Sequence, residues 1–310
     1  MTEETMKKIF ILLILNFLLI KNLSAANISG NSGTAAYPFL KIPVGARVTA
    51  MAENFVATAD DVNAIFYNPA GIAKINNIEV SAEHILWLET ISKSNLGFVY
   101  PHSVIGPVGV GINYVSVPYE KRTQESDESY QNASVYSAVI NLVWAKQLKN
   151  NLIAGCGLKY ITENLDIQST SGLALDIGGI YRLSEKYTIG LAIQNLGTQF
   201  VSQNADPLPA LIRAGAATSL LNNKLLLASD LNYGLVDESV SIGIGGQYSL
   251  GKYFQPRLGY KIMLNNTNLE SISGLRAGFG VNYKKISFDY AISPWSDLGL
   301  VHQVTLVIKI

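Results

Sequence analysis

The stretch Gly274-Leu275-Arg276-Ala277-Gly278-Phe279-Gly280-Val281-Asn282-Tyr283 alternates apolar residues with small or polar ones at every position. Successive side chains of a β-strand point to opposite faces, so one face of this stretch is apolar and the other carries Gly, Arg and Asn. A soluble sandwich would place more Lys, Glu and Thr on its exposed face. The composition instead suits the crowded, hydrated interior of a barrel, with the apolar face pointing outward.

The same period of two recurs along the rest of the chain. It is clearest over 172–182, 240–249, 286–293 and 302–310, and about fourteen such segments fit between residue 78 and the C-terminus. The predicted connections alternate in length. Short ones lie near 149–151, 184–186, 221–224, 251–252 and 284–285, and long ones span 117–132, 163–171, 197–207, 264–272 and 294–301. Outer-membrane barrels have short turns on one side and longer loops on the other.

The sequence therefore predicts an all-β membrane protein, a single closed antiparallel transmembrane β-barrel of about 14 strands over residues 77–310. A closed barrel satisfies every backbone polar group in lipid without an open edge. A soluble β-sandwich or propeller is the alternative. The expected location is the outer membrane, because Lys7 and Lys8 precede an apolar run to Ile20 and small residues follow at 24–26. We interpret 1–26 as a cleavable signal peptide; a retained N-terminal anchor helix is the alternative.

Composition excludes several classes of protein. Lys plus Arg equals Asp plus Glu, at 23 each, so nothing indicates a nucleic-acid partner. The single cysteine, Cys156, leaves no intramolecular disulfide and no thiolate metal cluster. His84, His102 and His302 lack metal-ligand spacing, and no Gly-x-Ser-x-Gly motif is present. We predict no enzyme activity, no metal and no cofactor.

Several charged residues fall on the predicted inner face of the barrel. They are Lys159, Asp176, Arg213, Asp230, Arg257, Lys261, Arg276, Asp289 and Lys309. One interpretation is a network of mixed sign that braces the interior. The other is a path for a solute, or a docking surface inside the pore. Pairs across the barrel are not assigned from sequence.

Residues 27–76 break the alternation and read as short helices and turns. Asp60 and Asp61 are placed to cap a helix that begins near Val62. Asn68-Pro69-Ala70-Gly71 combines an Asx-type turn, a proline suited to a helix start and a glycine free to take positive φ. Because a barrel of fourteen strands is too wide for its own side chains to fill, we predict that 27–76 forms a plug in the lumen.

A family resemblance adds to these observations. Its residues are Gly45, Ala46, Arg47, Met51, Asp60, Asp61, Tyr67, Asn68, Pro69, Ala70 and Gly71, with Asp297, Leu298, Gly299 and His302 near the C-terminus. This pattern resembles the PorV/PorQ family of outer-membrane barrels, which is related to the FadL long-chain fatty-acid transporters. The family usually has a Gly-Gly pair where this chain has Ala52-Glu53. Arg47 is expected to pair with Asp60 or Asp61, and Asn68 with nearby amides, to hold the plug against the wall.

The resemblance implies three possible roles. A PorV-like protein would be a type IX secretion component that docks secreted cargo proteins together with other secretion subunits. A FadL-like channel would instead admit a hydrophobic ligand such as a long-chain fatty acid. A structural barrel is the third. A polar lumen with a broad mouth favours docking, and an apolar tunnel favours transport. Outer-membrane lipid is a partner in each case.

Overall fold

The computed structural model describes residues 33–88, 91–122, 130–166, 168–200, 205–265 and 271–310. The predicted signal peptide at 1–26 and the first residues of the predicted plug lie outside these ranges. No helix among the described residues has both the length and the apolar character needed to span a membrane.

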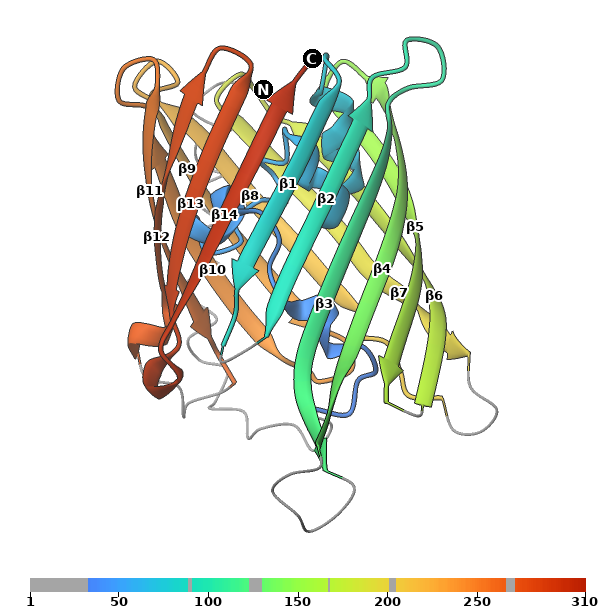
Figure 1. Ribbon diagram of the computed structural model, residues 1–310. Helices are drawn as coiled ribbons and strands as arrows, with labels where there is room; N and C mark the ends of the chain where they lie inside the picture. The colour runs from blue at the N-terminus through green and yellow to red at the C-terminus, as the bar shows by residue number, and fades with distance from the viewer. Residues whose placement is uncertain (1–32, 89–90, 123–129, 167, 201–204, 266–270) are drawn as a thin grey trace.

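Fourteen antiparallel strands form one closed barrel (Figure 1). They are β1 (Glu79–Leu86), β2 (Ser92–Tyr100), β3 (Val108–Arg122), β4 (Tyr130–Lys149), β5 (Leu152–Leu165), β6 (Gln168–Arg182), β7 (Tyr187–Phe200), β8 (Leu211–Leu220), β9 (Leu225–Gly234), β10 (Val240–Tyr248), β11 (Phe254–Met263), β12 (Leu275–Tyr283), β13 (Ile286–Pro294) and β14 (Leu300–Lys309). Each strand pairs with its neighbours in sequence, and β1 closes the ring against β14, with Glu79 opposite Lys309. The predicted closed antiparallel barrel is confirmed.

The strand faces follow the predicted alternation. On β6, Leu173, Leu175 and Ile177 point outward and are exposed, whereas Ala174 and Asp176 point inward and are buried. The outer surface of the wall is thus an apolar belt. The inner surface carries small and polar residues.

Most of the shorter connections lie at one end of the barrel and most of the longer ones at the other. The turn end holds the connections 101–107, 150–151, 183–186, 221–224, 249–253 and 284–285, together with the start of β1 and the end of β14. It lies at the top of Figure 1. The loop end holds 87–91, 123–129, 166–167, 201–210, 235–239, 264–274 and 295–299.

Two predicted loops are shorter than expected. The connection expected over 163–171 is only 166–167, and β3 and β4 continue their pairing to Arg122 and Tyr130. Strand pairing depends on backbone hydrogen bonds, which do not end where the apolar outer face ends. Polar residues beyond the belt therefore extend the hairpins.

The described N-terminal residues 33–76, which we call the inner segment, lie inside the barrel (Figure 1). Their elements are short: η2 (Pro38–Lys41), α2 (Ala46–Ala50), η3 (Val62–Phe66) and η4 (Pro69–Lys74). Only α2 is α-helical and the others are 3-10 helices, each of one or two turns. The segment is buried from Val48 to Ala59 and from Asp61 to Ile72.

Glycines on the wall make room for the inner segment. A Cβ on Gly155 of β5 would lie 2.6 Å from the backbone of Pro69 and Ala70, and a Cβ on Gly259 of β11 would lie 2.6 Å from Ala52 N. Contacts this close are not tolerated between non-bonded atoms. The inward glycines thus act as a surface against which the segment packs.

Gly71 differs from the expectation. It does not have a positive φ, and instead its Cβ would collide with the Cβ atoms of Ala59 and Ala64. A glycine is therefore required at 71 because two parts of the inner segment approach each other closely, and the chain does not turn left-handed there.

Candidate functional site

Three wall carboxylates bind backbone N–H groups of the inner segment. Glu83 Oε1 accepts a hydrogen bond from Gly45 N at 2.7 Å, and Glu79 Oε2 accepts one from Val62 N at 3.0 Å. Asp230 Oδ2 accepts from Phe55 N at 2.8 Å and from Val56 N at 2.9 Å. A buried backbone N–H group is costly without a hydrogen-bond partner, and these carboxyl oxygens supply one. The wall therefore holds the segment at points distributed along its length.

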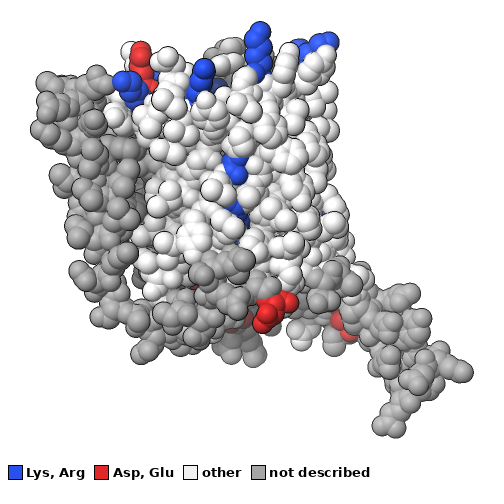
Figure 2. All heavy atoms as spheres, turned by 90° about the vertical axis from the view of Figure 1, so that its left-hand side faces the viewer, with Lys and Arg blue, Asp and Glu red and all other residues white. Residues whose placement is uncertain are grey.

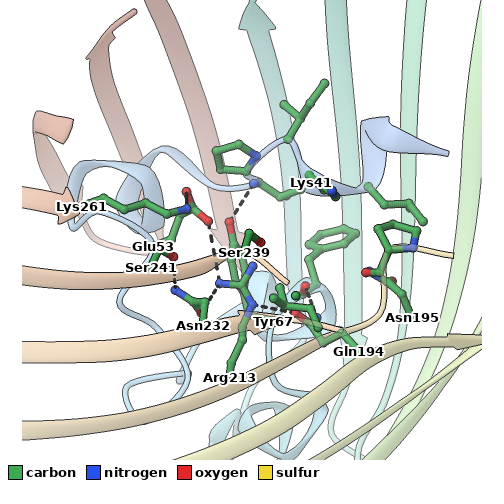
Figure 3. A pocket seen from close by; sticks show the side chains of 18 of the residues that line it. Lys41, Glu53, Tyr67, Gln194, Asn195, Arg213, Asn232, Ser239, Ser241 and Lys261 are labelled. Atoms are coloured by element: carbon green, nitrogen blue, oxygen red, sulfur yellow. Dashed lines mark hydrogen bonds and ion pairs between the residues drawn. The ribbon is translucent and has the colours of Figure 1, made fainter. Parts of the chain in front are cut away.

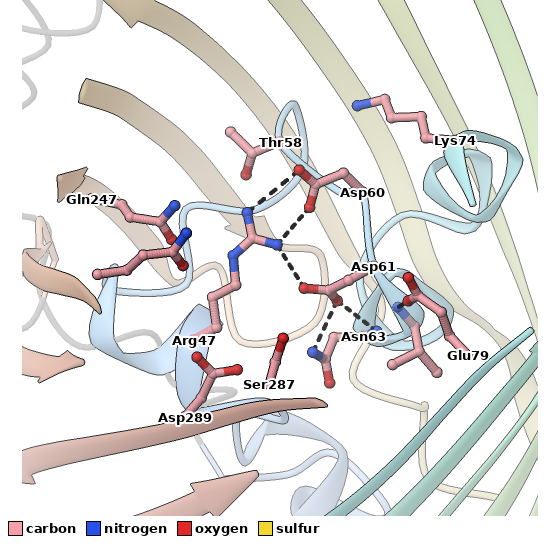
Figure 4. Close-up of polar contacts among 12 residues, drawn as sticks. Arg47, Thr58, Asp60, Asp61, Asn63, Lys74, Glu79, Gln247, Ser287 and Asp289 are labelled. Atoms are coloured by element: carbon pink, nitrogen blue, oxygen red, sulfur yellow. Dashed lines mark hydrogen bonds and ion pairs between the residues drawn. The ribbon is translucent and has the colours of Figure 1, made fainter. Parts of the chain in front are cut away.

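The signature residues form a second cluster, within the inner segment. Arg47 Nη1 lies 2.6 Å from Asp60 Oδ1 and 2.6 Å from Asp61 Oδ2 (Figure 4). Although burial by itself would lower the pKa of Arg47, the two carboxylates raise it above its ordinary value. Arg47 thus joins two turns of the segment to each other; among the described residues, it forms no hydrogen bond or ion pair with the wall.

Asp61 and Asn68 cap the short helices as predicted. Asp61 Oδ1 accepts from Asn63 N at 2.8 Å, and Asn68 Oδ1 accepts from Ala70 N at 3.2 Å. Asn68 Nδ2 also donates to Gly179 O of β6 at 3.2 Å, so this signature residue does reach the wall. Asp60 pairs with Arg47 and makes no cap among the described contacts.

The lumen contains a cavity of about 480 Å³ between the inner segment and the loop end. Its lining is mixed. Apolar residues include Leu40, Ile42, Val44, Phe66, Val139, Leu211, Met263 and two tryptophans, Trp87 and Trp295; charged residues are Lys41, Glu53, Lys159, Arg213, Asp237, Lys261 and Arg276. Figure 3 draws 18 of the lining side chains and labels ten of them, which come from the inner segment, from strands β7 to β11 and from the connection between β9 and β10.

Glu53 of the inner segment lines the cavity and pairs with two cations of the barrel wall. Its Oε1 lies 2.7 Å from Lys261 Nζ, and its Oε2 lies 3.8 Å from Arg213 Nη1. Burial favours the neutral carboxyl, but Lys261 and Arg213 outweigh it and lower the pKa of Glu53 to about 2. Glu53 and the preceding Ala52 both have positive φ, at 64° and 55°. These are the positions where the resembled family has Gly-Gly, so the ion pairs hold a turn that non-glycine residues disfavour.

Arg213 is further positioned by neutral groups. Its Nε donates to Gln194 Oε1 at 2.8 Å, its Nη1 donates to Asn232 Oδ1 at 3.0 Å, and its guanidinium lies 5.2 Å from the centroid of the Tyr67 ring. Tyr67 Oη accepts from Val44 N at 2.9 Å. Burial raises the pKa of Tyr67 above its ordinary value, so the phenol stays neutral.

A bulge in β7 places two consecutive polar side chains inside the barrel. The register between β6 and β7 shifts between Leu175 and Ile177, and both Gln194 and Asn195 are buried. Lys159 Nζ donates to Asn195 Oδ1 at 2.6 Å and lies 2.7 Å from Asp176 Oδ2. A bulge adds one residue to a strand and redirects its side chains, which alternation alone does not predict.

Arg276 lies at a different corner of the cavity. Its Nη1 donates to Ser273 O at 2.6 Å and to Leu275 O at 2.8 Å, and its guanidinium lies 5.7 Å from the centroid of the Trp295 ring. Among the described residues, no carboxylate forms an ion pair with Arg276. Ser273 Oγ and Trp295 Nε1 are buried nearby, also without a hydrogen-bond partner in the described part of the chain. This corner therefore has a positive charge and two donors available.

The other predicted inner charges lie elsewhere. Arg257 Nη1 lies 2.5 Å from Asp289 Oδ1 beside a polar pocket of about 240 Å³ near the turn end, which Arg47, Asp60 and Asp61 also line. Lys309 pairs with Glu79 at 3.1 Å. The structure therefore divides the predicted inner charges into separate clusters.

The C-terminal motif does not line the cavity. Asp297 and Leu298 are exposed in η6 (Ser296–Leu298), Gly299 has a φ of 96°, and His302 Nδ1 lies 2.7 Å from Tyr290 Oη on the outward face. These residues shape the last loop.

Sequence reasoning missed Glu53, Glu79 and Glu83. A signal was present for the last two, because Glu79, Ser81 and Glu83 alternate with Val80, Ala82 and His84 and so share one strand face. Acidic side chains that recur on the inward face of a strand indicate that a hydrogen-bond donor lies inside the barrel. The role of Glu53 had no such local signal. No group of His, Cys, Asp and Glu among the described residues is arranged to hold a metal ion.

Several solved structures have the same fold. The chain is similar to the Pseudomonas putida toluene transporter TodX, with 13% identity, a TM-score of 0.60, and coverage of 86% of this chain and 96% of that one. A Pseudomonas aeruginosa FadL homologue gives 11% identity, a TM-score of 0.55, and coverage of 86% and 99%. The Ralstonia pickettii toluene transporter TbuX gives 14% identity, a TM-score of 0.53, and coverage of 86% of this chain and 97% of that one. At such identities the likeness concerns the fold, and it supports the FadL-like part of the predicted resemblance.

Comparison with curated protein sequences finds no match. Residues 21–206 match the pattern of the family described as uncharacterised protein family UPF0164. This range contains the inner segment and the strands from β1 to β7. Because the match spans more than half of the 310 residues, the chain belongs to the UPF0164 family.

Proposed function

We propose that the protein is an outer-membrane barrel that binds a hydrophobic molecule with an anionic group in the loop-end cavity, as the first step of its passage. The fold shared with the toluene transporters and the FadL homologue supports a channel over an enzyme. The mixed lining of the cavity supports an amphipathic ligand over a purely apolar one.

The observation that carries the proposal is the charge balance of the cavity. Lys159 is paired with Asp176, and Lys41 with Asp237. Lys261 and Arg213 share Glu53. Arg276 alone, of the cations that line the cavity, forms no ion pair with a described carboxylate; Glu53 acts on it only from a longer distance. A buried charge without a partner is costly, so an anionic group of a ligand is well placed to offset it.

The donors beside Arg276 suit the same group. Ser273 Oγ and Trp295 Nε1 can each donate to an anion, and neither has a partner in the described chain. Trp87 packs edge-on against Trp295, with ring centroids 5.1 Å apart, and extends the apolar lining away from the charge. The corner thus presents a cation, two hydrogen-bond donors and an adjoining apolar surface.

The test compares palmitate with hexadecanol, a neutral molecule of similar length, by titration calorimetry on the detergent-solubilised protein. We expect palmitate to bind more tightly. The variant Arg276→Gln should weaken palmitate binding about tenfold or more, because a charge-assisted hydrogen bond is lost. Binding of hexadecanol should change little.

Arg182→Gln is the matched control, since Arg182 is exposed at the turn end, away from the cavity. It should leave both affinities unchanged. Equal affinity for palmitate and hexadecanol, or wild-type palmitate binding by Arg276→Gln, would contradict the proposal. Absence of binding by either ligand would favour a structural barrel.

A second candidate is the PorV-like role in type IX secretion. It is favoured by the signature between Gly45 and Gly71, and by the β3–β4 hairpin, which extends past its neighbours at the loop end (Figure 1). Such an extension offers backbone and surface for docking a secreted protein. Affinity purification from solubilised outer membranes tests this role. Recovery of secreted proteins or a surface peptidase would support docking, and bound lipid alone would support the first candidate.

A further inference from the structure

The charges of the chain are sorted between the two ends of the barrel, although the total is balanced at 23 of each sign. Exposed cations gather at the turn end: Lys146, Lys149, Arg182, Lys186, Lys224, Lys252, Lys284, Lys285 and Lys309. We call these nine residues the basic rim. The connections of that end contain a single acidic residue, Glu185.

The loop end has the opposite character. Its described connections carry Asp166, Asp206, Asp237, Glu238 and Asp297, and no Lys or Arg. The cations Lys121 and Arg122 end β3 at this end, and Lys41 pairs there with Asp237, so the acidic character belongs to the connections themselves. Figure 2 shows this tendency on one face of the molecule, with most Lys and Arg along the upper edge, beside one acidic residue, two basic patches on the wall, and Asp and Glu near the lower edge. The barrel is therefore electrically polar along its axis.

The basic rim surrounds the barrel. At least one exposed cation lies in, or directly beside, five of the six turn-end connections, those after β4, β6, β8, β10 and β12. A protein partner would be expected to select one side of the barrel. A cationic ring instead matches a partner that encircles the molecule, which is what a lipid leaflet does.

The rim also adjoins the apolar belt. Tyr253 and Tyr283 lie beside it with ring centroids 6.2 Å apart, and Lys284 Nζ lies 5.4 Å from the centroid of the Tyr283 ring. Exposed Phe254 and Tyr248 lie on the same end. Aromatic residues next to lysines at the end of an apolar surface are typical of the level of lipid head groups.

We propose that the basic rim binds the phosphate groups of anionic phospholipids in the leaflet at the turn end. This rests on the proposed placement of the barrel in a membrane. Lys ammonium groups attract anionic lipids when they lie near the surface, and the attraction decreases with salt. The acidic loop end would be repelled by the same lipids, so the charge distribution also favours one orientation relative to an asymmetric bilayer.

The test measures lipid selectivity. The protein is reconstituted in phosphatidylcholine bilayers, and the motionally restricted fractions of spin-labelled phosphatidylglycerol and phosphatidylcholine are compared by electron paramagnetic resonance. We expect a preference for phosphatidylglycerol of up to about fivefold, the effect of one Lys near the surface. The variant Lys149→Gln/Lys224→Gln/Lys252→Gln/Lys284→Gln/Lys285→Gln should bring this ratio close to one. Added salt at about 1 M should do the same to the wild-type protein.

Lys41→Gln is the matched control, because it removes a cation at the opposite end, where Lys41 pairs with Asp237 at 2.6 Å. It should keep the preference. A phosphatidylglycerol-to-phosphatidylcholine ratio of one for the wild-type protein would overturn the proposal. An unchanged ratio in the five-residue variant would also overturn it. In that second case another surface of the barrel selects the lipid, or the basic rim binds an anionic protein instead. Palmitate binding by the same preparations, measured separately, shows whether the cavity proposal stands when the rim proposal fails.

Discussion

At the scale of single residues, the inner segment is held by a few charged groups that differ in how they are satisfied. Glu79, Glu83 and Asp230 bind backbone N–H groups, whereas Glu53 binds side-chain cations of β8 and β11. The first kind fixes the path of the backbone. The second kind depends on two flexible side chains, so it is the more readily released by a competing anion in the cavity.

Glu53 should make the stability of the protein depend on pH. Its folded pKa is depressed from 4.5 to about 2, so its contribution is present above pH 4.5 and is lost as the pH falls toward 2. A shift of this size corresponds to about 3 kcal/mol. Glu53→Gln should therefore lower the urea midpoint at pH 7 and flatten its dependence on pH between 5 and 2.

Asp206→Asn provides the comparison, because Asp206 is exposed in the loop between β7 and β8. Its pH profile should follow that of the wild type. If Glu53→Gln keeps the full wild-type pH dependence, the ion pairs with Lys261 and Arg213 do not stabilise the fold.

At the scale of elements, the fit between wall and inner segment depends on which strand face a glycine occupies. Gly178 and Gly179 are neighbours on β6 but face opposite ways. A Cβ on Gly178 would overlap Asn68 Oδ1 and lie 2.9 Å from Pro69 Cδ, whereas one on Gly179 would meet only Ile153 O, at 3.7 Å. The inward glycine gives the start of η4 its place against the wall.

Gly178→Ala should thus displace Asn68 and loosen η4 while the barrel remains closed. We expect a loss of about 1–3 kcal/mol, the usual cost of overpacking, and faster cleavage of the inner segment by added protease. Gly179→Ala should behave as the wild type in both measurements. Equal protease resistance of the two variants would show that this contact does not position the segment.

At the scale of the whole molecule, the closed barrel presents an apolar belt outward and places its polar groups inside. Leu175 on β6, for example, is 52% exposed, and outward residues of the same kind recur on the other strands. In water such a surface would drive association. In a bilayer it meets lipid, and closure leaves no backbone edge unpaired.

A charge in the middle of the belt should therefore be costly. Leu175→Arg is expected to lose about 2–4 kcal/mol of stability in lipid, the range for Arg near a bilayer midplane. Leu165→Arg serves as its control, since Leu165 ends β5 beside the loop-end residue Asp166 and is also exposed. Unfolding by urea in vesicles measures both. A similar small effect for the two variants, or recovery of the protein as a water-soluble monomer, would contradict a belt in contact with lipid.

The features that depend on interactions between residues close together in the chain could be predicted from the amino-acid sequence. The period of two around Arg276 predicted the inner and outer faces, the lengths of most connections predicted two unlike ends, and Asp61 and Asn68 were recognised as caps. Each follows from backbone geometry within a few residues. The pairing of Arg47 with Asp60 and Asp61 came from a family resemblance and is seen in the structure.

Which inner charges meet depends on the three-dimensional arrangement of the closed barrel. Glu53 and Lys261 are 208 positions apart, and Asp230 binds the backbone of Phe55 and Val56, which are 175 and 174 positions away. Their contact depends on barrel closure, on the β7 bulge and on the path of the inner segment, none of which has a local signal. For the same reason two features became visible only when the strands were placed around a common axis: the lack of an ion pair between Arg276 and any described carboxylate, and the ring of lysines. The alternation of apolar and polar residues along a strand fixes the face on which a side chain lies. Its neighbours in space are fixed only by the strand register and the closure of the barrel.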